Sequence, residues 1–140
     1  MTLTRLERRW AEAAMVAIFP GSVEAGLAGI GAMQVDAFLR EVMRTLPFRA
    51  ALGVRLAVWL VAVAPWFMLR RFATIAGLGL AERERVIARL VASRSYAVRS
   101  LALLLKAIGA LLYAADDRVR RRMAPPRPRL AQLRGRAPAV

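Results

Sequence analysis

With 140 residues and 59% hydrophobic content, the chain is long enough for one domain with a modest core and is more apolar than most soluble globular chains. It contains no Cys, His or Asn, which excludes disulfides, a thiolate nucleophile, the usual catalytic triads and a zinc site of the ordinary kind. The net charge of +14 comes from 23 basic residues, of which only Lys106 is a lysine, against nine acidic ones.

The first predicted helix begins at a capping box, in which the Thr4 hydroxyl and the Glu7 carboxylate close the first turn. It ends near Phe19, because Pro20-Gly21 stops a helix. An arginine pair before an apolar run suggests an export signal, but the run is brief and Glu12 interrupts it. We therefore expect no export signal, and a cytoplasmic location or one at the cytoplasmic face of a membrane.

We expect residues 22–31 to form a short helix or a loop. Residues 34–46 have the pattern of an amphipathic helix. In that helix Asp36 and Arg40 are an acid and a base four residues apart, in the favourable order. Pro47 then suits the start of the next helix.

The next helix is the most apolar part of the chain, with 14 uncharged residues between Arg55 and Arg70. Pro65 lacks a backbone donor and is expected to kink or break the helix. Three interpretations remain open: a buried core helix, an in-plane or re-entrant membrane segment, and a membrane span, for which the run is short. Residues 71–79 are predicted to be a linker.

Residues 80–119 predict two helices and the start of a third. The first has an apolar stripe at helical spacing, Ser93 and Ser95 offer caps, and the second is apolar nearly all round. Lys106, inside the second helix, is expected to reach the surface. Asp116-Asp117 is interpreted as the cap of the last segment rather than as an acid and base pair.

The tail beyond Met123 has four prolines and no acid, so we predict a helical domain at residues 1–123 and a disordered basic tail at residues 124–140. Eight arginines and no carboxylate lie from Arg118 onward. The predicted fold class is all-α, a small bundle of about five helices. No catalytic, cofactor-binding or metal-binding residues are predicted, and we expect the chain not to be an enzyme.

One set of residues resembles a known pattern: Phe72, Ile75, Leu80 to Val86, Leu90, Ser93-Arg94, Arg99, Leu105-Lys106, Leu112-Tyr113 and Asp116. It is similar to the helical region before the flavin domain of long-chain (fatty) alcohol oxidases. It also resembles, more distantly, the small subunit of gluconate 2-dehydrogenase-type complexes. The resemblance covers roughly residues 70–120. Ala114 stands where the family commonly has a second tyrosine, and Asp117 where a proline is frequent.

The resemblance implies an accessory subunit that packs on a separate FAD-dependent oxidoreductase of the glucose–methanol–choline class. FAD is then expected on the partner, and none on this chain. An apolar helix pair with no cover of its own is compatible with such a role. The expected partner or membrane contacts are Trp59, Trp66, Phe67, Leu101, Leu105, Ile108, Leu112 and Tyr113. The basic residues expected to hold anionic lipid or an acidic patch are Arg120, Arg121, Arg122, Arg127 and Arg129.

Two other functions remain open. The first is a small monotopic or hairpin membrane protein without an enzyme partner, its basic flanks on the cytoplasmic side. The second, suggested by the charge alone, is nonspecific binding of nucleic acid, which we expect less because the arginine-rich tail has no aromatic residues for base stacking.

Overall fold

The computed structural model describes residues 2–21, 29–70 and 72–123, and within them the chain is all-α, as predicted. The described residues form six α-helices, where about five were expected, together with two short 3₁₀ helices, η1 and η2. In chain order they are α1 (Arg5–Ile18), η1 (Ile30–Ala32), α2 (Val35–Thr45), α3 (Phe48–Met68), η2 (Ile75–Gly77), α4 (Leu80–Val91), α5 (Tyr96–Ala115) and α6 (Asp117–Met123).

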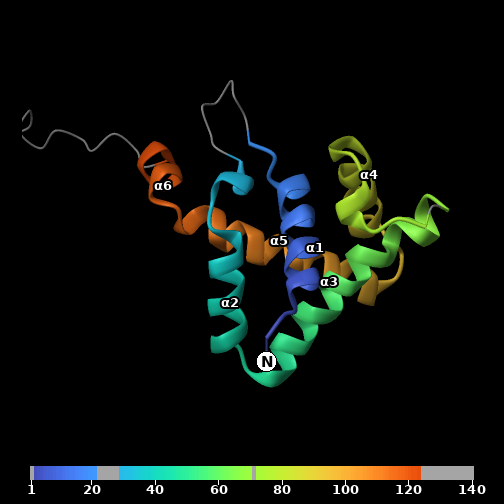
Figure 1. The fold of residues 1–140 in the computed structure, drawn as a ribbon, viewed down its shortest axis with the longest axis horizontal. Helices are drawn as coiled ribbons and strands as arrows, with labels where there is room; N and C mark the ends of the chain where they lie inside the picture. Colours follow the sequence, from blue (N-terminus) through green and yellow to red (C-terminus); the bar gives the residue numbers. More distant parts are fainter. Residues whose placement is uncertain (1, 22–28, 71, 124–140) are drawn as a thin grey trace, which may run out of the picture.

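Helix α1 lies in the middle of the bundle and contacts α2, α3, α4 and α5 (Figure 1). Its buried residues are mostly small, among them Ala11 and Ala14, and they let the neighbouring helices approach closely. Helices α3 and α5 form the most extensive pair, and Gly53 of α3 lies against Leu104 of α5. Figure 1 places α2 at one side of the bundle and the end of α3 at the other.

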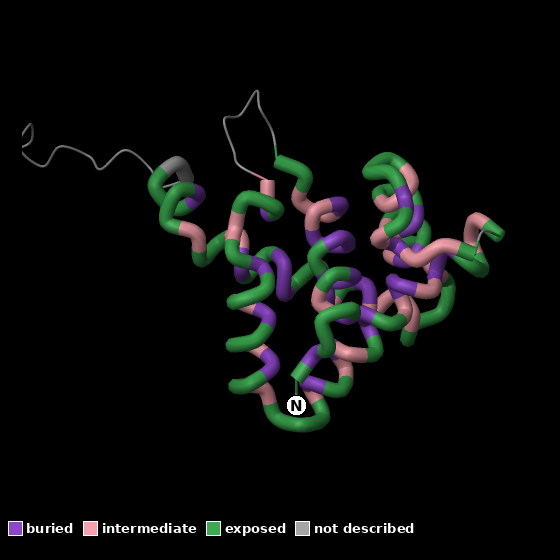
Figure 2. The backbone as a smooth tube through the Cα atoms, viewed as in Figure 1, coloured by how far each residue is buried: buried purple, intermediate pink, exposed green. Residues whose placement is uncertain are grey.

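The core is formed by one face of each helix, as Figure 2 shows for the alternation of buried and exposed residues along α2. In α2 the buried residues Val35, Leu39 and Met43 recur every four positions, which is the helical period predicted for this segment. The Asp36–Arg40 ion pair forms on the wet face, with Arg40 Nη2 2.6 Å from Asp36 Oδ2.

The predicted helix caps are present at both ends of the chain. Thr4 Oγ1 accepts from the backbone N–H of Glu7, and the Glu7 carboxylate accepts from the backbone N–H of Thr4. Asp116 Oδ1 accepts from the backbone N–H of Arg118 at 2.8 Å and caps α6. Ser95 is the residue before α5, but its side chain makes no capping hydrogen bond. The Ser93 hydroxyl accepts a hydrogen bond from the backbone N–H of Ser95.

The middle of the chain differs from two predictions. Pro65 does not break α3, which continues to Met68, because the missing donor falls in the last turn and the N–H of Leu69 still bonds to the Pro65 carbonyl. The segment predicted to be a linker is also folded, because η2 forms inside it and packs against α1 and α3. The apolar side chains of Ile75 and Leu78 are buried in the core.

Residues 22–28 and the predicted tail, 124–140, lie outside the described residues, and with the tail Arg127 and Arg129. Arg120 and Arg121 are exposed on α6, to which Arg122 also belongs.

Candidate functional site

The most unusual surface of the molecule is the outward side of α3. Four large apolar residues, Phe48, Leu52, Leu56 and Trp59, are exposed at spacings of four, four and three positions, so they form one stripe along the helix. We call this stripe the α3 face. The opposite side of the same helix is buried against the bundle by Ala51, Val54, Ala57, Val58, Val61, Ala62, Ala64 and Pro65.

The apolar surface extends past the α3 face. Beyond Trp59 it continues through half-buried Val63 to Trp66 and Phe67, and Phe72 follows after the turn. With about 200 Å² on each aromatic residue, the five aromatics from Phe48 to Phe72 expose on the order of 700 Å². That exceeds the apolar patch of most monomers, which indicates that other molecules cover this surface.

Trp59, the last residue of the stripe, is held in place by contacts on the inner side of the helix. Its indole Nε1 donates to Glu7 Oε1 at 2.7 Å, and its ring packs edge-on against Trp10 with centroids 5.2 Å apart. Even so, 45% of the residue is exposed. A large aromatic ring that is already fixed in place loses little conformational entropy on binding, which is the property of an interface anchor.

Glu7 is the buried acid that organises this part of the molecule. It is 1% exposed, and its Oε1 also accepts from Arg55 Nε at 2.6 Å, so one carboxylate joins α1 to α3 through two side chains. Burial alone would raise the pKa of Glu7, but hydrogen bonds from the Thr4 backbone, Trp59 and Arg55 outweigh it and lower the pKa from its ordinary value of 4.5. Glu7 is therefore an ionised structural anchor and not a proton donor at neutral pH.

The charges carried by α3 itself and by the turns that flank it are of one sign. From residue 42 to residue 81 the sequence has no acidic residue. Arg49 is exposed at the start of α3 and Arg70 just beyond its end, while Arg55 is half-buried and paired with Glu7. An apolar stripe bracketed by cations favours a partner surface that is apolar at its centre and acidic or anionic at its edge.

The residues predicted as contacts divide into three groups. Trp59, Trp66 and Phe67 are exposed, as a contact surface requires. Leu101 and Tyr113 are half-buried, and Tyr113 stacks on Phe19 with ring centroids 5.5 Å apart. Leu105, Ile108 and Leu112 are buried in the chain's own core, so the bundle itself covers this side of α5 and the α3 face does not include them. Lys106 is exposed, as expected.

Several residues of this surface were not predicted from the sequence. Phe48, Leu52 and Leu56 were not singled out, although their spacing of four was readable in the sequence. Phe72, 97% exposed, entered only as part of the resemblance, since it fell in a supposed linker.

Comparison of the chain with protein-family models, with curated proteins and with solved structures found no match.

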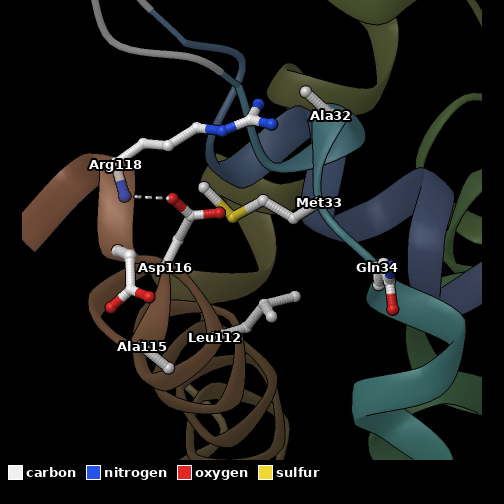
Figure 3. A pocket seen from close by; sticks show the side chains of 8 residues that line it. Ala32, Met33, Gln34, Leu112, Ala115, Asp116 and Arg118 are labelled. Atoms are coloured by element: carbon white, nitrogen blue, oxygen red, sulfur yellow. Dashed lines mark hydrogen bonds between the residues drawn. The ribbon is translucent and has the colours of Figure 1, made fainter.

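A polar hollow of about 390 Å³ lies where α5 and α6 meet the start of α2, and Figure 3 shows its side chains. In this hollow the Asp116 carboxylate accepts a hydrogen bond from the backbone N–H of Arg118. The hollow also contains Met33 and Gln34, and its second acid, Asp117, forms an ion pair with Arg120. Among the described residues no group of three or more acidic side chains is placed to hold a metal ion. The polar hollow is thus explained by the capping of α6.

Two of the described helices, α3 and α5, are long and apolar enough to cross a membrane when judged by length and composition alone. Buried helices of soluble bundles pass the same test, so length and composition alone do not distinguish a membrane span from a core helix. In this structure one side of α3 is buried in the bundle and its outer side exposes apolar residues.

Proposed function

We propose that the protein is a non-catalytic accessory subunit that binds a separate, larger protein through the α3 face. The observation that carries this proposal is the stripe Phe48, Leu52, Leu56 and Trp59, a row of large apolar side chains left uncovered on the outer side of a helix whose other side is buried in the core. A stripe of this kind is costly to leave in water, at about 25 cal/mol for each Å² of apolar surface.

The resemblance of residues 70–120 indicates which partner to expect. These residues include η2, α4, the whole of α5 and the start of α6, and the similar region of long-chain alcohol oxidases accompanies a flavin domain. We therefore expect the partner to be an FAD-dependent oxidoreductase of the glucose–methanol–choline class that acts on an apolar alcohol or a sterol-like substrate. In this assignment FAD and the chemistry belong to the partner, and this chain supplies a rigid apolar surface that stabilises it.

The test is affinity capture of the tagged full chain from the source cells, with flavin measured by fluorescence after acid release from the captured material. The proposal predicts a flavoprotein in stoichiometric amount. A capture that contains no flavin would overturn the assignment of the partner. If the chain also resists carbonate extraction from membranes, it is instead a small monotopic or hairpin membrane protein without an enzyme partner.

Two matched variants locate the interface. Leu56→Glu places a charge in the middle of the α3 face and is expected to weaken capture at least about tenfold, as loss of a central contact does. Leu111→Glu makes the same substitution at a more exposed leucine on α5 and is expected to retain the flavoprotein. Equal losses in the two variants would mean that the α3 face is not the interface.

A further inference from the structure

The far end of α3 forms a corner with three outward aromatic residues, Trp66, Phe67 and Phe72, which we call the aromatic corner. Phe67 is 80% exposed and Phe72 is 97% exposed, and the rings of Trp66 and Phe72 lie 6.2 Å apart across the turn. The corner occupies one extremity of the bundle, opposite α2 (Figure 1).

The turn at this corner is built with an unusual residue. Arg70 has φ 51°, in the left-handed region where helices usually end on glycine. Arg70 thus places a cationic side chain at a position whose backbone conformation glycine would adopt at lower energetic cost. Arg70 is exposed, and Arg89 Nη1 of α4 donates to the Met68 carbonyl at 3.3 Å on the same turn.

An apolar hollow of about 240 Å³ opens beside the corner, between α3, α4 and α5. It is lined by Leu60, Val63, Ala64, Phe67, Met68, Leu90, Ser93 and Val98. The corner therefore combines projecting aromatic rings, an adjacent apolar hollow and a cation.

The neighbouring charges favour an anionic surface. No acid lies between residues 42 and 81. On the adjoining α4, Glu82 directs its carboxylate to the N–H of Gly79 at the start of its own helix, and Glu84 lies at a different hollow, beside α1 and Lys106. Projecting aromatic residues need a matching recess in a protein partner, whereas the interface of a bilayer adapts to them. Tryptophan is enriched at that interface because its ring is apolar and its N–H is polar.

We propose that the aromatic corner inserts into the interfacial layer of a bilayer that contains anionic lipids, with Trp66, Phe67 and Phe72 at the acyl boundary and Arg70 at a lipid phosphate. This membrane site lies beyond the accessory role and stands independently of it. The α3 face from Phe48 to Trp59 remains available to a protein while the corner contacts lipid.

The absence of cysteine in the chain permits a clean test. The full-length chain with Phe72→Cys carries one environment-sensitive fluorophore, and it is mixed with vesicles of phosphatidylcholine alone or of phosphatidylcholine with phosphatidylglycerol. The proposal predicts a blue shift, and quenching by nitroxides placed in the lipid, with the anionic vesicles. The matched probe at Ala37→Cys, on the exposed side of α2, is expected to remain in water.

A second substitution tests the side chains themselves. Phe67→Ser in the labelled chain is expected to lower vesicle partitioning roughly tenfold or more, because a largely exposed phenyl ring would lose its burial in lipid. Its melting curve should match that of the parent, since Phe67 packs little in the folded chain.

Three results would overturn the proposal. Vesicle binding with both probes still in water would show that the arginine-rich tail alone holds the membrane. Unchanged partitioning of the Phe67→Ser variant would exclude the aromatic corner. A probe at residue 72 that stays in water with vesicles but is buried by a captured protein would assign the corner to that protein.

Discussion

Replacing Glu7 with glutamine keeps the shape of the side chain and removes its charge, which tests the anchor between α1 and α3. One carboxylate oxygen accepts from Arg55 and Trp59 at 2.6 and 2.7 Å, and the other accepts from the Thr4 N–H at 2.7 Å. Glutamine retains one acceptor oxygen, but its NH₂ group then faces a donor at the second position.

The expected loss of stability is about 2 kcal/mol. A hydrogen bond to a charged group contributes roughly 1.5–3 kcal/mol, and a donor left unsatisfied adds to the loss. The share of Arg55 is discounted, because its side chain is 34% exposed and solvent screens the pair. Against a total of about 5–15 kcal/mol for a small domain, the change is large enough to measure by urea denaturation.

The pH dependence gives the sharper signature. Because the pKa of folded Glu7 is lowered from 4.5, the native state binds fewer protons than the unfolded state as the pH falls. Its contribution is therefore complete above the ordinary pKa and disappears as the pH falls through the lowered one. The wild type and Glu7→Gln should differ most near neutral pH and converge in acid.

The matched control is Glu12→Gln, an exposed acid on the same helix, which should follow the wild type within about 0.5 kcal/mol at every pH. A Glu7→Gln variant as stable as the wild type, or one that loses stability in acid as steeply, would refute the role of the buried carboxylate.

Two further predictions concern backbone positions. Gly109→Ala should destabilise by about 1 kcal/mol, because its Cβ would lie 2.8 Å from Phe19 Cε2, whereas Gly53→Ala, 3.6 Å from Leu104 Cδ2, should gain up to about 1 kcal/mol from helix propensity; thermal melting compares them, and equal signs would contradict this packing. Arg70→Gly should stabilise by about 1 kcal/mol by relieving the left-handed φ, while vesicle partitioning should fall; unchanged partitioning would remove Arg70 from the lipid contact.

Local chemistry made most of the fold predictable. Thr4 with Glu7, the four-residue period of α2 and the Asp116 cap are each contained within one or two turns of chain, and each is found in the structure. The partners of Glu7 were not predictable in this way, since Arg55 and Trp59 lie 48 and 52 positions away.

The outward side of α3 escaped prediction for a different reason. Beyond Arg49 and Arg55 the helix has no charged residue, so most of its hydrophobic pattern does not mark which side faces the core. Only the packing of α1 and α5 against it leaves Leu56 outside and Val58 inside. Phe72 was obscured by a glycine-containing segment that resembled a linker and turned out to be packed.

The central claim is that a second protein covers the α3 face in the cell, and site-specific photo-cross-linking tests it most directly. A photoreactive amino acid replaces Leu56 in the full-length chain, and in a control it replaces Ala37 on the exposed side of α2. Irradiation of living cells should join the Leu56 probe to one flavoprotein and leave the Ala37 probe without a major product. No protein adduct from the Leu56 probe, at expression equal to the control, would contradict the account.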